Sequence, residues 1–190
     1  LWSLTDQLFH VYSMRVRSVL EVGVGNGFVA GFLKSAGVNV TTVDINPNLN
    51  PDIVASVLDM DRAVPVGRFD LVSCCEVLEH LPFEDFEASI RIFSSLADKL
   101  FLTLPLLGKK YGFGGFFNVP KIRSRWVGAW IKVRSRKCKM ADEHWWELDS
   151  RRECSRKSVA RILGRYYDRV DQGFLKANPY HYYFECCRSA

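Results

Sequence analysis

The amino-acid sequence predicts an α/β fold built on a doubly wound, mainly parallel sheet. Apolar runs typical of strands alternate with amphipathic runs typical of helices, and the last two strand-like runs have no helix between them. Strands that alternate with helices pair in parallel, whereas two strands joined by a short turn run in opposite directions. We therefore expect one antiparallel strand near the end of the chain and a ligand site at the carboxyl ends of the parallel strands.

The individual elements follow from composition and spacing. The expected strands are rich in apolar and β-branched residues, and they cover 18–24, 39–45, 52–60, 69–77, 99–105, 168–177 and 181–189. Helices are expected where apolar residues recur at helical spacing, over 28–37, 82–96 and 155–167. Gly37 is placed to end the first of these helices, and Pro82 is placed to begin the second.

The composition is that of a globular protein. Hydrophobic residues make up 48% and charged residues 25% of the chain, which predicts a single domain over residues 1–190. No apolar run approaches the roughly 20 residues that cross a bilayer, and the first residues lack a signal-peptide pattern. The cysteines form no C-x-x-C spacing for zinc or redox chemistry. We expect a cytoplasmic protein, with peripheral membrane attachment left open.

Residues 18–27, SVLEVGVGNG, place Gly23, Gly25 and Gly27 directly after an expected strand that contains Glu21. A glycine turn in this position lets a ligand approach the main chain. A dinucleotide site requires the spacing G-x-G-x-x-G to cradle a pyrophosphate, and the spacing here differs. S-adenosylmethionine (SAM) has no phosphate but carries a cationic amino-acid end and a sulfonium. An acid at the strand end suits that cation better than it suits an anion.

The next two expected strands add candidate contacts for the same ligand. Asp44 closes the second strand, where a carboxylate accepts both ribose hydroxyls in either kind of nucleotide site. Asp59 is placed to accept an adenine amino group, with Ile45 and Met60 beside the ring, and Cys75 lies at the end of the fourth strand. A dehydrogenase usually needs a second domain for its substrate, and little chain remains for one.

These motifs together resemble the class I SAM-dependent methyltransferases, and most closely the branch that contains quinone-biosynthesis methyltransferases. The resemblance rests on LEVGVGNG, Asp44, LDMD, FDLVSCCEVLEHL and LFLTLP, in that order over residues 18–105, and it resumes loosely over 155–188. It implies a Rossmann-like, seven-stranded sheet whose last strand is antiparallel, with SAM as the cofactor. The alternative is a generic α/β binding domain.

The stretch CCEVLEHL carries Glu76, Glu79 and His80 at positions i, i+3 and i+4. On one helical turn the three side chains face the same way, and they are suitable ligands for Mg²⁺ or Mn²⁺. The same positions resemble the metal ligands of small-RNA 2′-O-methyltransferases, which add a histidine that His144 would supply here. We expect Glu79, His80 and His144 to be the catalytic residues, which contact the molecule that accepts the methyl group. The structural alternative is that Glu79 pairs with a surface base and His80 caps the turn before Pro82.

Residues 106–150 form a basic, aromatic insert in the predicted fold. Between Leu106 and Ala141 lie ten Lys or Arg and no acid, whereas the rest of the chain carries sixteen bases and twenty-one acids. A near-helical spacing of apolar residues predicts an amphipathic helix within it, through Ile122, Trp126, Trp130 and Val133. Three interpretations remain open: attachment to an anionic membrane, binding of single-stranded RNA, and a simple lid with solvated charges.

The sequence therefore predicts a SAM-dependent methyltransferase that methylates an oxygen on a hydrophobic or lipid-associated small molecule. One alternative is a metal-assisted RNA 2′-O-methyltransferase. A second is a catalytically idle SAM-binding module whose insert recruits a partner.

Overall fold

The sheet that carries the fold has seven strands in the order β3-β2-β1-β4-β5-β9-β8. The structure is a computed structural model that describes residues 2–65, 69–117, 125–133 and 138–189. The strands are β1 (Ser18–Val22), β2 (Asn39–Asp44), β3 (Ile53–Val54), β4 (Phe69–Cys75), β5 (Ala97–Pro105), β8 (Arg169–Phe174) and β9 (His181–Cys187). β9 pairs antiparallel with both β5 and β8, and the other pairs are parallel. The predicted fold class is confirmed.

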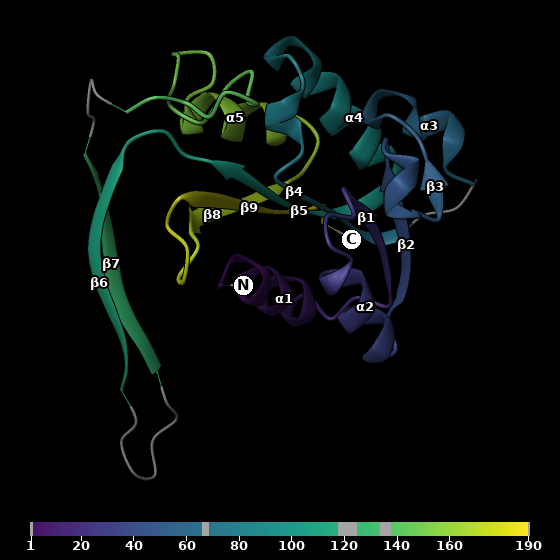
Figure 1. The fold of residues 1–190 in the computed structure, drawn as a ribbon, viewed down its shortest axis with the longest axis horizontal. Helices are drawn as coiled ribbons and strands as arrows, with labels where there is room; N and C mark the ends of the chain where they lie inside the picture. Colours follow the sequence, from purple (N-terminus) through teal and green to yellow (C-terminus); the bar gives the residue numbers. More distant parts are fainter. Residues whose placement is uncertain (1, 66–68, 118–124, 134–137, 190) are drawn as a thin grey trace.

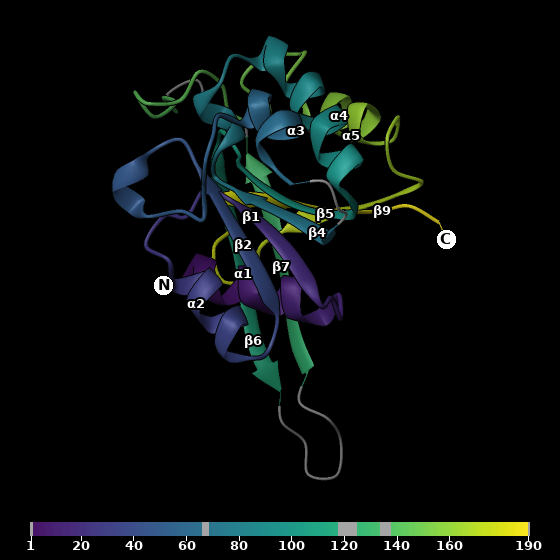
Figure 2. The same ribbon diagram turned by 90° about the vertical axis from the view of Figure 1, so that its right-hand side faces the viewer.

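Helices cover both faces of this sheet (Figures 1 and 2). One face carries α1 (Trp2–Ser13) and α2 (Phe28–Ser35), and the other carries α3 (Met60–Ala63), α4 (Phe86–Leu96) and α5 (Arg156–Leu163). Short 3-10 turns follow several strands: η1 (Pro47–Leu49), η2 (Val57–Asp59), η3 (Leu78–His80) and η4 (Phe83–Asp85). No helix within the described residues is long and apolar enough to cross a bilayer.

The register of the parallel strands brings their carboxyl ends to one edge of the sheet. Val22 at the end of β1 lies opposite Val43 on one side and Cys74 on the other, and Cys75 lies opposite Thr103. The loops that leave these strands therefore meet at the same edge. This is the edge at which ligands bind in doubly wound folds.

The third strand is much shorter than the sequence predicts. Only Ile53 and Val54 pair with β2, and the chain then turns into η2 and α3. The Ser56 side chain accepts a hydrogen bond from the Leu58 N–H at 3.4 Å, and this cap favours the turn over a longer strand. The predicted strand over 52–60 is therefore wrong for most of its length.

The basic insert contains a β-hairpin, β6 (Lys109–Phe117) and β7 (Arg125–Val133), and the predicted amphipathic helix is wrong. Trp130 pairs with Gly112, where an added Cβ would lie 2.5 Å from the Trp130 ring. Gly112 thus leaves space for the Trp130 ring across the hairpin. Trp126 lies in β7 by its backbone, and Ile122 lies outside the described residues.

The hairpin projects away from the main sheet and is fastened at its base (Figure 1). The Lys132 side chain forms an ion pair with Asp149, and the Lys110 ammonium donates to the Leu106 carbonyl. Asp149 also accepts from Arg156 at the start of α5. The base of the hairpin is therefore tied to the segment that leads back into the fold.

We predict that the main sheet folds without the hairpin. Lys109 and Val133 lie opposite each other, so a four-residue Gly-Ser linker can replace 109–133 without separating the flanking chain. The loss of the Lys132–Asp149 pair should cost about 1 kcal/mol, which lowers the melting temperature by about 2–4 °C in a chain of this size. Circular dichroism on heating measures this shift.

Phe93→Ala is the matched control, because its side chain is fully buried in the core. That change should cost about 3–5 kcal/mol and lower the melting temperature much further. A hairpin-free chain that melts as low as this control would contradict the prediction.

Candidate functional site

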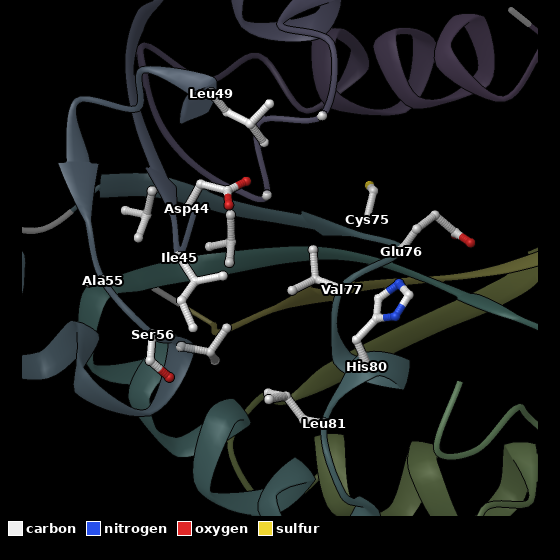
Figure 3. Close-up of a pocket in the computed structure, with 15 residues that line it drawn as sticks. Asp44, Ile45, Leu49, Ala55, Ser56, Cys75, Glu76, Val77, His80 and Leu81 are labelled. Carbon is white, nitrogen blue, oxygen red and sulfur yellow. The ribbon is translucent and has the colours of Figure 1, made fainter. Parts of the chain in front are cut away.

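A cavity of about 510 Å³ opens at the carboxyl ends of β1, β2 and β4 (Figure 3). Its volume lies within the usual range for small-molecule sites. Asp44 and Ile45 lie on one side of it, and Glu76 and His80 lie on the other. The remaining lining is largely apolar: Val22, Gly23, Gly25, Val43, Leu49, Ala55, Ser56, Val57, Cys75, Val77 and Leu81.

The glycine turn after β1 brings the main chain to the wall of this cavity. Gly23 has φ of +85°, and a Cβ added there would lie 2.5 Å from the Val77 side chain. Both the left-handed conformation and this contact require glycine. The turn is held by the Val24 N–H, which donates to Asp44 Oδ2 at 2.8 Å. A ligand in the cavity can therefore approach peptide groups with no side chain in between.

Asp44 combines a structural role with free acceptor capacity. Its Oδ2 accepts from the Val24 N–H and its Oδ1 from the Asn46 N–H, each at 2.8 Å. An ionised carboxylate has about four acceptor positions, so roughly two remain for a ligand. Asp44 lines the cavity, as expected of a residue that binds a pair of ribose hydroxyls.

Glu21 lies beneath the glycine turn in an adjoining cavity of about 280 Å³, which also contains Leu4 and Gln7 of α1. The two cavities share Gly23, Gly25, Cys75 and Glu76 in their linings. Glu21 is 3% exposed, and its Oε2 has no hydrogen-bond partner. Burial raises its pKa from 4.5 to about 7, and Lys34 opposes this only in part. A cationic ligand group would stabilise the charged form.

The structure brings together most of the predicted cofactor residues. Gly23, Gly25, Asp44, Ile45 and Cys75 line the main cavity, and Glu21 lines its neighbour. Gly27, with φ of +71°, caps the start of α2 and lines neither.

Asp59 and Met60 do not line either cavity. Because the chain leaves β3 early, Ala55, Ser56 and Val57 line the wall instead, and Met60 is fully buried in the core. Asp59 is exposed at the end of η2. Contact of these two residues with an adenine ring stays a prediction.

Glu79, His80 and His144 form a cluster, and His80 is its member that lines the main cavity, on the side away from Asp44. One ligand atom from each residue lies within 4.8 Å of the others, which is close enough to share a metal ion. Glu79 is fully buried and neither carboxylate oxygen has a hydrogen-bond partner. Burial, followed by repulsion from Glu76, raises the pKa of Glu79 well above its usual value. The predicted proximity of these three side chains is thus present in the structure.

Glu76 is not a member of this cluster, although the sequence predicts it as a metal ligand. Its backbone has φ of +57°, and its side chain turns toward two other strands. Oε1 accepts from the Thr103 hydroxyl at 2.6 Å, and Oε2 lies 2.8 Å from His181 Nε2. These contacts hold the Glu76 carboxylate beside β5 and β9, where it lines the main cavity and is close enough to Glu79 to raise the pKa of that group.

Sequence reasoning misses four polar residues at this end of the site: Thr103, Glu147, Tyr180 and His181. Glu147 is 1% exposed and accepts from His144 Nδ1 at 3.1 Å and from the Tyr180 hydroxyl at 3.0 Å. Thr103 lies within LFLTLP, Glu147 lies three residues after His144, and Tyr180 is adjacent to His181, but none of these patterns marks a polar side chain of the site. The NPY turn before His181 is a weak signal, because it marks where β9 begins beside β5.

The fold and the glycine turn of this chain are those of the class I SAM-dependent methyltransferases. The magnesium protoporphyrin IX methyltransferase of Synechocystis PCC 6803, solved with bound SAM, matches 98% of this chain and 78% of its own, with a TM-score of 0.62 and 17% identity. A small RNA methyltransferase matches 99% of this chain and 25% of its own, with a TM-score of 0.65 and 15% identity. At these identities the likeness shows the fold alone.

Residues 4–148 match the family described as a methyltransferase domain, so the chain belongs to that family. The ubiquinone biosynthesis O-methyltransferase of Escherichia coli is 29% identical over 112 residues, which are 50% of this chain and 46% of that protein. The chain therefore spans about half the length of the curated relatives that it matches. The resemblance seen in the sequence is confirmed at the level of the family.

We predict that Glu21 makes the ligand-free protein less stable as the pH rises from 4.5 to 7. In this range the folded state retains the Glu21 proton while the unfolded state has lost it, so the free energy of unfolding falls with pH. The loss totals about 3 kcal/mol and is complete above pH 7. Urea unfolding at pH 5 and pH 8 should show this fall in the wild type and a smaller one in Glu21→Gln.

The control is Glu84→Gln, which changes an exposed carboxylate in η4. It should leave the pH dependence of the wild type intact. The same slope in Glu21→Gln and in this control would contradict the assignment.

Proposed function

We propose that this chain transfers the methyl group of SAM to a hydroxyl oxygen of a hydrophobic, lipid-associated small molecule. The observation that carries the proposal is the cluster of Glu79, His80 and His144, whose member His80 lines the cavity on the side away from Asp44. Methyl transfer to an amine needs little more than alignment, whereas a hydroxyl usually needs a base or a metal ion. The O-methyltransferase of Escherichia coli that matches half of the chain supports the same acceptor atom.

The two cavities suggest how SAM would lie. Asp44 would accept from the ribose hydroxyls, and the apolar side chains of Ile45, Ala55 and Val57 would flank the adenine. The amino group of SAM would meet Glu21 in the smaller cavity. Because Glu21 is buried and unpaired, this cation would supply the partner that its charged form lacks. The methyl group would then point toward Glu76 and His80.

His80 is oriented for a role at the acceptor oxygen. Its Nδ1 lies 3.1 Å from the backbone carbonyl of Glu143, which only accepts hydrogen bonds. Nδ1 therefore carries the proton, and Nε2 has a lone pair on a side chain that lines the cavity. As the oxygen–methyl bond forms and the sulfur–carbon bond breaks, the hydroxyl proton must leave. His80 Nε2 accepts it if the acceptor contacts the ring directly.

The cluster also fits a divalent cation, Mg²⁺ or Mn²⁺, with Glu79, His80 and His144 as ligands. The fit rests on Glu79, whose two buried oxygens have no hydrogen-bond partner, so that a cation would supply the compensation that its charged form lacks. When bound, the cation would lower the pKa of the acceptor hydroxyl. His80 Nε2 would then serve as a ligand instead of a proton acceptor.

The hairpin supports a lipid-associated acceptor. Tyr111 and Phe113 of β6 share one face with Ile131 and Val133 of β7, since 111 lies opposite 131. All four side chains are exposed, Phe113 by 73% and Ile131 by 67%. The ten Lys and Arg of the insert complement an anionic bilayer surface. An apolar face with surrounding bases is the pattern of an interfacial membrane anchor.

The function is tested by a transfer assay with methyl-labelled SAM and an extract separated into lipid, RNA and protein fractions. We expect label in the lipid fraction, with Mn²⁺ increasing the rate in the wild type. Asp44→Ala should weaken SAM binding at least about a hundredfold in calorimetry, because two charge-assisted hydrogen bonds are lost. Glu79→Gln should bind SAM normally but gain no activity or thermal stability from Mn²⁺.

Asp61→Ala and Glu84→Gln are the matched controls, since both change exposed acids outside the cavities. Label in RNA would overturn the lipid acceptor in favour of RNA 2′-O-methylation. SAM binding with label in no fraction would favour a binding module. A Glu79→Gln enzyme that Mn²⁺ still activates would exclude the proposed cation site.

Membrane attachment is tested by co-sedimentation with vesicles of phosphatidylglycerol and phosphatidylcholine. Phe113→Ser with Ile131→Ser should lower the partition coefficient at least about tenfold, because each side chain contributes roughly 1.5–3 kcal/mol when buried. Tyr12→Ser, which removes an exposed aromatic on α1, should leave partitioning unchanged. Equal partitioning of the double variant and the wild type would show that the hairpin face does not meet the bilayer.

A further inference from the structure

Glu147 stands at the centre of a buried hydrogen-bond network that has no counterpart in the sequence motifs. Its Oε1 accepts from three donors: the Ala141 N–H at 3.1 Å, His144 Nδ1 at 3.1 Å and the Tyr180 hydroxyl at 3.0 Å. The side chain is 1% exposed. Glu147 is not among the residues whose ligand atoms share the 4.8 Å cluster, and its hydrogen bond to His144 joins it to that cluster.

The donors at Oε1 determine which nitrogen of His144 carries the proton. The Ala141 N–H can only donate, so Oε1 acts as an acceptor. His144 Nδ1 must then donate to the same oxygen, which leaves the lone pair on Nε2. His80 has the same tautomer, because its Nδ1 donates to the Glu143 carbonyl. In both imidazoles Nε2 is thus the nitrogen with the lone pair, and the two ring centroids lie 5.1 Å apart.

The segment that holds Glu147 is fixed to the loops of the site. The Trp145 N–H donates to the Glu79 carbonyl at 2.9 Å, and the Trp146 indole donates to the Leu81 carbonyl at 3.0 Å. The Leu148 N–H donates to the Pro105 carbonyl at the end of β5. Glu147 therefore has little freedom to move relative to Glu79, and its hold on His144 fixes the direction of that ring.

We propose that Glu147 is a positioning residue that sets the tautomer of His144 and directs its Nε2 toward Glu79 and His80. The inference rests on the proposed function, because a fixed ring orientation matters when His144 is a metal ligand. In such sites the second ring nitrogen donates to a carboxylate or carbonyl, and loss of that partner lowers metal affinity about 10–100-fold. Tyr180 supports Glu147 by donating to the same oxygen.

Two substitutions separate the effect of the position of the Glu147 acceptor oxygen from the effect of its charge. Glu147→Gln keeps an acceptor oxygen at the same distance and removes the charge, whereas Glu147→Asp keeps the charge and withdraws the oxygen by one methylene. In ¹⁵N–¹H correlation spectra of the metal-free protein, we expect His144 to be protonated at Nδ1 in the wild type and in Glu147→Gln. The Nε2-protonated form should become the major one in Glu147→Asp.

Calorimetry with Mn²⁺ provides the second readout. The affinity should fall about 10–100-fold in Glu147→Asp and by much less in Glu147→Gln. Asp142→Asn, an exposed acid on the same segment, is the control and should leave both readouts unchanged.

Protonation of His144 at Nε2 in the wild type, or an unchanged tautomer in Glu147→Asp, would overturn the inference. Loss of the tautomer in Glu147→Gln would overturn it as well. If the tautomers behave as expected but the wild type does not bind Mn²⁺, the positioning role stands and the cation site of the proposed function fails.

Discussion

The carboxyl ends of β1, β2, β4 and β5 stop at one edge of the sheet, and every part of the site depends on that alignment. β1 provides Glu21 and the glycine turn, β2 provides Asp44, and β4 leads directly to Glu76 and η3. β5 contributes Thr103 and leads toward the hairpin. A register shift of one residue in any of these strands would turn its functional side chain to the opposite face.

The site keeps three acids in places where water does not solvate them. Glu21 and Glu79 each have a buried oxygen without a partner, and so does Glu147 at Oε2. Burial of a charge without compensation destabilises a fold, so these residues reduce the stability of the ligand-free chain. A cationic cofactor end near Glu21 and a metal ion near Glu79 would each relieve one of these penalties. Ligand binding and folding stability are therefore coupled through the same carboxylates.

The sequence could predict those parts of the site that are formed by residues close together along the chain. The strand-turn-helix with Gly23 and the acid after β2 are local patterns, and Glu79 and His80 lie on one turn. His181 could not be found this way, because only tertiary folding brings it beside Glu76, and the position of Glu147 three residues after His144 does not by itself show that the two side chains meet. The spacing of Trp126, Trp130 and Val133 fits a helix, yet alternate residues of the same segment also fit a strand. The structure shows a strand, in which Gly112 of β6 leaves space for the Trp130 ring across the hairpin.

The attachment of the hairpin has a mechanical consequence. Lys132 near the end of β7 pairs with Asp149, which is two residues beyond Glu147 and itself has φ of +62°. The other strand is held by Lys110, whose ammonium lies over the ring of Tyr180, the same tyrosine that donates to Glu147. β6 is thus joined through Tyr180 to Glu147, and β7 is joined to the segment that contains Glu147. A force that bends the hairpin would therefore be transmitted through these two contacts to the segment around Glu147 and His144.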